Sequence, residues 1–68
     1  MPSSVVAWFG YDASVKVLTV RYISGAIYEY LGVPGEIYGE MRSSKSKGIY
    51  LNKHIKPYYD YRKVEDAA

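Results

Sequence analysis

The chain has 68 residues, enough for one domain of marginal stability, because a domain this small buries only about 60% of its unfolded surface. It has no cysteine and one histidine, which excludes a disulfide framework and a cysteine-based metal site. With a net charge of +2, no apolar run near the roughly 20 residues of a membrane helix and no basic N-terminal flank, it is typical of a soluble protein. We expect a single cytoplasmic domain over residues 1–68, ordered over about 4–64, with no cofactor and no membrane partner.

Three segments in the first half have the composition and alternation of β-strands. Residues 5–11 are apolar and aromatic, and residues 12–14 have the composition of a turn. Residues 15–22 alternate between an apolar and a mixed face, and a third strand is expected over residues 26–31. The pattern predicts a three-stranded antiparallel meander.

The first hairpin has two possible registers. A three-residue turn would direct Val6 and Trp8 inward, whereas a four-residue turn would direct Val5, Ala7 and Phe9 inward. We favour the four-residue turn, which leaves Trp8 near the surface as a candidate contact residue.

The second hairpin has one register that gathers its large side chains. A three-residue loop over residues 23–25 pairs Val20 with Tyr28. It also pairs Leu18 with Tyr30, whereas a two-residue loop scatters these side chains over both faces. The glycine at the third loop position suits the left-handed residue of a type I turn with a G1 bulge. We therefore expect both tyrosines on the covered face of the sheet.

Two short helices are expected after the strands. Pro34 suits the first turn of a helix that ends near residues 43–44, and Ile37 and Met41 form its apolar stripe. Ser46 can cap the second helix.

The second helix is anchored by one apolar pair. Leu51 and Ile55 are four residues apart and point inward, and Pro57 ends the helix. Residues 58–64 should run extended across the sheet or the helices, and residues 65–68 should fray. The predicted fold is α+β: a three-stranded antiparallel β-meander followed by two short helices packed on one sheet face. Its predicted core comprises Leu18, Val20, Tyr22, Tyr28, Tyr30, Ile37, Met41, Leu51 and Ile55.

The basic residues lie mostly in the second half of the chain. Residues 42–63 contain seven lysines and arginines and one acid, Asp60. Because such cations pair with phosphates and tyrosine rings stack on bases, RNA is the leading candidate partner. We expect Tyr59 as an alternative stacking residue. The candidate RNA-binding residues are Lys45, Lys47, Tyr50, Asn52, Lys53, His54, Lys56, Tyr58, Arg62 and Lys63.

A protein partner is the alternative to RNA. The expected open face of the sheet mixes aliphatic with polar side chains, and such a patch can mark a partner surface or a homodimer seam. Its expected residues are Val17, Thr19, Arg21, Ile27, Glu29 and Leu31. The sequence does not determine the oligomeric state.

The sequence favours a non-catalytic protein. Tyr50 and His54 are four residues apart and could share a hydrogen bond, but such a pair is more often a surface contact than a catalytic one. Glu36 and Glu40 lie on one helix face without a third converging acid, and no glycine-rich phosphate loop is present. We therefore expect a binding module rather than an enzyme.

A series of motifs extends over residues 3–64, and their order is more specific than any one of them. In chain order they are Gly10-Tyr11-Asp12, Leu18-x-Val20-x-Tyr22, Gly25, Tyr28-Glu29-Tyr30, Val33-Pro34, Tyr38, Ser46-Lys47-Gly48-x-Tyr50-x-Asn52, Ile55 and Tyr59-x-Tyr61. The series resembles the KTSC domain, named for the C-terminus of some lysyl-tRNA synthetases and also found as small stand-alone bacterial proteins. The resemblance implies an RNA-binding role without an established mechanism.

Overall fold

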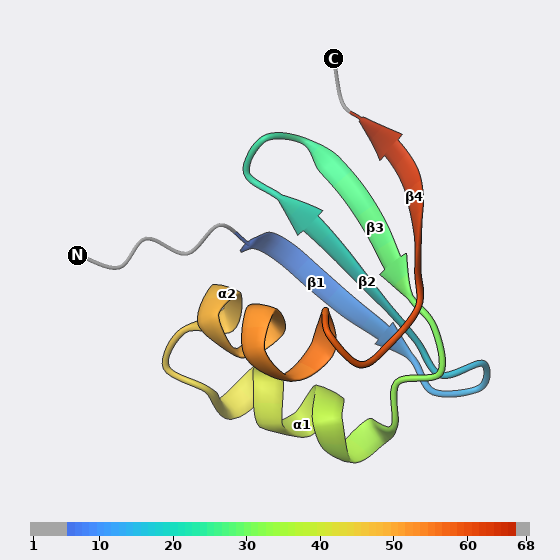
Figure 1. Cartoon of the computed structure of the whole chain (residues 1–68), viewed down its shortest axis with the longest axis vertical. Helices are drawn as coiled ribbons and strands as arrows, with labels where there is room; N and C mark the ends of the chain where they lie inside the picture. The colour runs from blue at the N-terminus through green and yellow to red at the C-terminus, as the bar shows by residue number, and fades with distance from the viewer. Residues whose placement is uncertain (1–5, 67–68) are drawn as a thin grey trace.

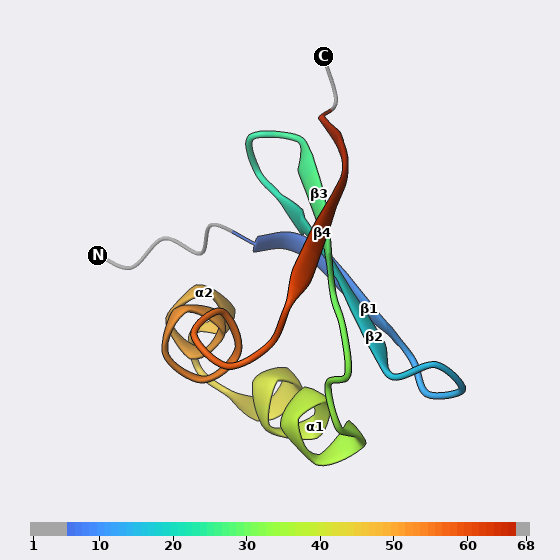
Figure 2. The same ribbon diagram turned by 45° about the vertical axis from the view of Figure 1, so that its right-hand side comes forward.

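A four-stranded antiparallel sheet carries two helical segments on one of its faces (Figures 1 and 2). The computed structural model describes residues 6–66. Within them the elements are β1 (Val6–Asp12), β2 (Val17–Tyr22), β3 (Ala26–Tyr30), α1 (Gly35–Ser43), α2 (Lys47–Tyr50), η1 (Leu51–Ile55) and β4 (Tyr61–Asp66). The strand order is β1-β2-β3-β4, so the α+β class is confirmed. None of the described helices is long and apolar enough to cross a membrane.

The fourth strand corrects the predicted three-stranded sheet. Tyr61 pairs with Tyr30 and Arg62 with Glu29, so the segment that follows the helices returns to the free edge of β3. The expected fraying from residue 65 onward is wrong for residues 65–66, which belong to β4, whereas residues 67–68 lie outside the described part. The extended run predicted over residues 58–64 contains most of β4, but the sequence left open whether it crosses the sheet or the helices. Local patterning does not determine its pairing with β3, because β4 is an exposed edge strand without apolar alternation.

The register of the second hairpin is confirmed. Val20 pairs with Tyr28 and Leu18 with Tyr30. Gly25 has a φ of +99°, and its backbone N–H donates a 2.8 Å hydrogen bond to the carbonyl of Tyr22. The loop therefore needs a residue that adopts a left-handed conformation without steric cost.

Replacing Gly25 with alanine is expected to destabilise the domain by about 1–2 kcal/mol, because a Cβ is unfavourable in the left-handed conformation. Gly39→Ala in α1 is the matched control. It is expected to stabilise by about 0.5–1 kcal/mol, since a Cβ there meets no atom within 4 Å and glycine weakens a helix interior. Urea unfolding of both variants measures the contrast, and a Gly25→Ala variant as stable as the parent would contradict the turn geometry.

The first hairpin has the favoured four-residue turn, with a bulge that the sequence did not predict. Phe9 packs against the core as expected. The register shifts between Val6 and Trp8, so Val6 also packs against the core. Ala7 is exposed rather than inward, which corrects the prediction for this residue. Trp8 is 56% exposed, whereas Val5 lies outside the described residues.

The second helical segment changes type along its length. Ser46 caps it as expected, since its hydroxyl accepts a 3.2 Å hydrogen bond from the N–H of Ile49. From Leu51 to Ile55 the helix widens to a π-helix, in which the N–H of Lys56 donates a 2.9 Å bond to the carbonyl of Leu51. Both Leu51 and Ile55 are fully buried. The sequence indicated the helix and its inward pair, but not the wider turn.

The core joins the sheet to both helical segments. Six predicted core residues are buried: Leu18, Val20, Tyr30, Met41, Leu51 and Ile55. The predictions for Tyr22, Tyr28 and Ile37 need correction, because these side chains are only partly buried and pack at the edge of the core. Val33 is fully buried although it was not among the predicted core residues, and its carbonyl accepts a 2.6 Å hydrogen bond from the Tyr11 hydroxyl.

Candidate nucleic-acid interface

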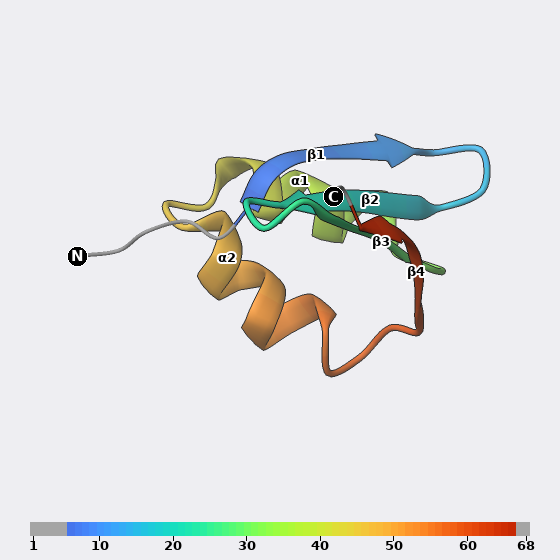
Figure 3. The same ribbon diagram turned by 90° about the horizontal axis from the view of Figure 1, so that it is seen from above.

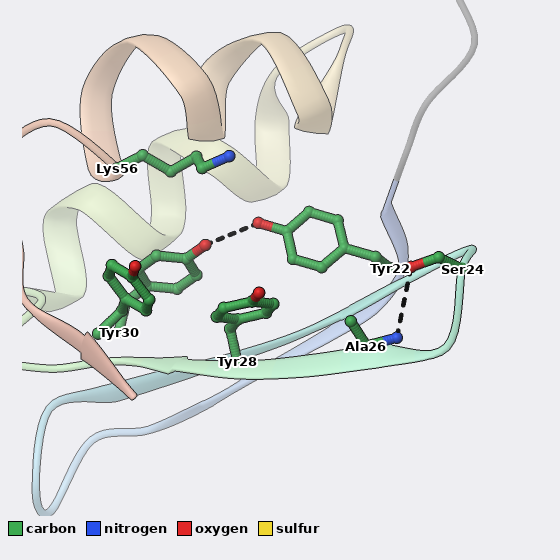
Figure 4. A pocket seen from close by; sticks show the side chains of 7 residues that line it. Tyr22, Ser24, Ala26, Tyr28, Tyr30 and Lys56 are labelled. Carbon is green, nitrogen blue, oxygen red and sulfur yellow. Dashed lines mark hydrogen bonds between the residues drawn. The ribbon is translucent and has the colours of Figure 1, made fainter. Parts of the chain in front are cut away.

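The helices leave one end of the sheet uncovered. The β2–β3 hairpin and the end of β4 extend beyond the helical layer (Figure 1). On the helix side of this end lies a pocket of about 370 Å³ (Figure 4). We call it the tyrosine pocket; its lining residues are Tyr22, Ser24, Ala26, Tyr28, Tyr30, Lys56 and Tyr61.

Four tyrosine rings form the walls and floor of the tyrosine pocket. The Tyr28 ring lies 5.5 Å from the ring of Tyr22, at 86°, and 5.5 Å from that of Tyr61, at 53°. Tyr30 is 1% exposed and forms the floor, 6.4 Å from Tyr28. The strand register produces this cluster, because alternate residues of β2, β3 and β4 point to the same face.

Two hydroxyl groups meet inside the tyrosine pocket. The Tyr22 and Tyr30 oxygens are 2.7 Å apart (Figure 4). Burial raises the pKa of both phenols; their mutual hydrogen bond raises the pKa of Tyr30 further and lowers that of Tyr22. We assign Tyr30 as the donor, because its buried proton has no solvent to bond. Tyr22 is then the acceptor and keeps its own O–H for a ligand.

One cation overhangs these rings. The Lys56 Nζ lies 5.9 Å from the centroid of the Tyr22 ring, and its side chain reaches across the pocket in Figure 4. Among the described residues, Lys56 forms no ion pair. The tyrosine pocket therefore contains a positive charge that has no carboxylate partner within residues 6–66, and this charge attracts anions.

A second hollow of about 390 Å³ adjoins the tyrosine pocket and shares Lys56 and Tyr61 with it. Its lining residues are Lys56, Pro57, Tyr58, Tyr59, Asp60 and Tyr61. Tyr58 is 73% exposed and Tyr61 is 61% exposed. We call the two hollows together the aromatic groove. The structure thus places the candidate residues Lys56 and Tyr58 on adjoining hollows, and β3–β4 pairing places Lys63 opposite Tyr28.

Other candidate residues lie around a separate hollow of about 330 Å³ beside α2. They are Lys45, Tyr50, Lys53 and His54. The expected hydrogen bond between Tyr50 and His54 is not formed: their rings are in contact at 4.6 Å, and the Tyr50 hydroxyl donates to Glu40 Oε1 at 2.7 Å. Burial and this bond raise the pKa of Tyr50 to about 12.

The remaining candidates are dispersed. Lys47 Nζ donates a 2.7 Å hydrogen bond to the Ser44 carbonyl, and Asn52 is exposed outside all three hollows. Arg62 points to the opposite face of the sheet, where it forms an ion pair with Glu29, with Nε 2.9 Å from Oε1. Strand alternation explains this separation, since Arg62 lies between Tyr61 and Lys63 in β4.

The aromatic groove includes residues that the sequence did not assign to a site. Tyr22 and Tyr28 were predicted as core, and Tyr61 was not predicted to contact RNA. The available signal was the excess of tyrosines on the covered face, because a hydroxyl-bearing ring suits the margin of a core better than its centre.

Within residues 6–66, no helix lies over the opposite face of the sheet, because α2 lies on the other side (Figure 3). Trp8 is exposed there and its ring lies over Gly10, where an added Cβ would be 2.6 Å from the indole. The ion pair of Arg62 with Glu29 makes part of this face polar. A protein partner on this face stays a prediction.

Stability is expected to fall at alkaline pH because three tyrosines hold their protons more tightly in the fold. Unfolded tyrosines titrate near pH 10. The raised pKa values of Tyr22, Tyr30 and Tyr50 therefore contribute stability that is complete below about pH 10 and is lost as pH rises through the folded values, about 12 for Tyr50. Tyrosinate absorbance and circular dichroism should be followed together as the pH is raised. These tyrosines are expected to ionise above pH 10, and their ionisation should accompany unfolding. Ionisation of every tyrosine near pH 10 with the fold intact would contradict it.

Comparison with known proteins gives a consistent result. The family model "KTSC domain" matches residues 2–65. The crystal structure of a KTSC domain protein from Yersinia pestis is similar, with a TM-score of 0.87 and 31% identity, covering 96% of this chain and 92% of that one.

Curated relatives include a much longer enzyme and a protein of similar size. A lysine–tRNA ligase of Nostoc punctiforme is 33% identical over 61 residues, which are 90% of this chain but 11% of the ligase. An uncharacterised protein of Stutzerimonas stutzeri is 33% identical over 66 residues, or 96% of this chain and 93% of that protein. The chain therefore spans about one tenth of the ligase and nearly the whole of the smaller relative.

Proposed function

This chain belongs to the KTSC domain family, and from that premise we propose that it is a small non-catalytic binding module for single-stranded RNA. The proposed contact surface is the aromatic groove. The lysine–tRNA ligase that contains a similar segment acts on an RNA, which makes tRNA or a tRNA-like strand the first ligand to test.

The observation that carries this proposal is the combination of exposed rings with a lysine that forms no ion pair in the described part of the chain. Tyr58 and Tyr61 present more than half of their surfaces to solvent, and Lys56 lies between the two hollows that these rings line. Bases of any identity can stack on tyrosine, and lysine attracts the phosphates that link them. Since a base must be unpaired to enter such a hollow, the groove suits a single strand better than a duplex.

The proposal replaces part of the residue set predicted from sequence. Arg62 is engaged by Glu29 on the other face. Lys53 lines the separate hollow beside α2, so the expected phosphate contact in the aromatic groove falls to Lys56. The expected stacking role passes from Tyr50, whose hydroxyl is bound by Glu40, to Tyr58 and Tyr61.

Binding of a mixed-sequence single-stranded RNA and of tRNA at two salt concentrations tests the proposal. Lys56→Ala is expected to reduce the slope of log affinity against log salt by about 0.7, the value for one phosphate contact on a single strand. Tyr61→Ala is expected to cost about 1–3 kcal/mol of binding free energy, the range for loss of one stacked base. Fluorescence anisotropy of labelled RNA measures both effects.

The matched controls lie on the opposite sheet face. Arg21→Ala removes one positive charge there and Trp8→Ala removes one exposed ring, and both are expected to leave RNA affinity within about twofold. Absence of RNA binding at low salt would overturn the proposal. Losses in Arg21→Ala and Trp8→Ala equal to those of the groove variants would place binding on the open face instead.

A further inference from the structure

We infer that the tyrosine pocket is a subsite for one nucleotide, with the base against Tyr28 and Tyr61 and a phosphate at Lys56 Nζ. This inference rests on the proposed function and adds to it a defined position for one unit of the strand. It concerns the tyrosine pocket alone, whereas the proposed function concerns the whole aromatic groove.

The size of the tyrosine pocket suits a single nucleotide. Its volume of about 370 Å³ lies near the lower end of the range for small-molecule pockets, about 300–1,000 Å³. A paired helix is far too wide to enter it. The adjoining hollow continues past Tyr61, so a neighbouring nucleotide can follow outside the pocket.

The rings offer a planar ligand both stacking and edge contacts. Tyr28 makes an 86° angle with Tyr22 and a 53° angle with Tyr61, so the rings stand around the space instead of closing it. Tyr61 is 61% exposed, so much of its ring is available before a ligand binds. A base that lies against one ring meets the edge of another, which is the favourable geometry for aromatic pairs.

Two hydroxyls are available for the polar edge of a base. Tyr22 accepts from Tyr30 in the assignment made above and retains its own proton, which can be donated into the pocket. The Tyr28 hydroxyl has no hydrogen-bond partner within residues 6–66, and Figure 4 shows it pointing into the same space. A ring that carries both donors and acceptors on its edge can satisfy these groups, whereas a hydrocarbon ring cannot.

The charge on Lys56 selects the chemical class of the ligand. A cluster of tyrosine rings without the lysine would also suit a quaternary ammonium ion. Here the ammonium of Lys56 already lies 5.9 Å from the Tyr22 ring and has no carboxylate partner in the described part of the chain. A second cation would be repelled and an anion attracted, so an aromatic ring that carries a phosphate fits better than a cation.

Titration with adenosine monophosphate and with adenosine, followed by amide shifts in nuclear magnetic resonance, tests this assignment. The parent protein is expected to bind the monophosphate about tenfold more tightly than the nucleoside, as for one charge-assisted hydrogen bond. Lys56→Met should abolish that difference and leave adenosine binding unchanged. Tyr61→Leu should weaken both ligands by about tenfold.

Lys53→Met is the matched control, because Lys53 is an exposed lysine of the same helical segment that does not line the tyrosine pocket. It should retain the tenfold preference, and the melting temperatures of all three variants should match the parent. Equal affinity for adenosine and its monophosphate, the same loss in Lys53→Met as in Lys56→Met, or tighter binding of tetramethylammonium would overturn the subsite.

The two proposals can fail separately. The parent protein could bind RNA oligonucleotides, with losses in Lys56→Ala and Tyr61→Ala, and yet not bind the monophosphate. This result would overturn the subsite and leave the RNA-binding function standing. Lys56-dependent binding of the monophosphate without groove-dependent binding of RNA would support the subsite and overturn the proposed function.

Discussion

Replacing Tyr30 with alanine is expected to destabilise the domain by about 3–5 kcal/mol. The ring is 1% exposed and contacts the core, and its removal leaves a cavity beside Leu18 and takes away the hydrogen bond to Tyr22. A chain of this length has roughly 3–10 kcal/mol of folding free energy in total, so the variant should be largely unfolded at ambient temperature. Circular dichroism with urea titration measures the loss.

Two further substitutions separate the contribution of the Tyr30 ring to stability from those of its hydroxyl and of the neighbouring Tyr28 ring. Tyr30→Phe keeps the ring and is expected to cost about 1 kcal/mol for the lost hydrogen bond. Tyr28→Ala should cost clearly less than Tyr30→Ala, because Tyr28 is only partly buried. The sequence alone would predict equal effects for Tyr28 and Tyr30, so equal losses would show that the Tyr28 ring is more enclosed than this fold allows.

Replacing Leu51 with alanine is expected to cost about 2–5 kcal/mol. Leu51 is fully buried at the start of the π-helix and, with Ile55, fixes that segment on the core. Because Lys56 directly follows the π-helix, a shift of this helix should also displace the Lys56 ammonium from the tyrosine pocket. Thermal unfolding reports the stability, and the preference for a monophosphate over its nucleoside reports the displacement.

Ile49→Ala serves as the control for this position. Ile49 lies in α2 and is 54% exposed, so its truncation should change stability by no more than about 0.5 kcal/mol. A Leu51→Ala variant with the same melting temperature as Ile49→Ala would mean that the second helical segment is not fixed through Leu51.

The parts of the fold that follow from local rules were predictable. The β2–β3 register followed from the requirement that Leu18, Val20 and their partners share one face of the sheet. The position of Gly25 in the loop, where a left-handed conformation is needed, supported the same register independently. The α1 stripe, which includes the buried Met41, and the Ser46 cap likewise depend on neighbours a few residues apart. Such neighbours are visible in the sequence because local spacing alone decides their geometry.

The remaining features depend on contacts that sequence spacing does not encode. β4 exists because the edge of β3 was free, and the bulge in β1 allows both Val6 and Phe9 to reach the core. Of the residues predicted to bind RNA, Lys56 and Tyr58 line the aromatic groove, whereas Tyr22 and Tyr28 of the same groove were predicted as core. The tyrosines of β2 and β3 pass from core to surface where the helices end, and their periodicity does not reveal that boundary.

The π-helix has a consequence for the groove. In an α-helix, a residue five positions after Leu51 would lie roughly 140° around the axis, turned away from the sheet. The wider turn, closed by the bond from the Lys56 N–H to the Leu51 carbonyl, brings Lys56 back above Leu51 and over the Tyr22 ring. The position of the Lys56 ammonium therefore depends on the number of residues in this helical turn. An insertion or deletion in this turn would change ligand selectivity in a relative that kept every side chain of the pocket.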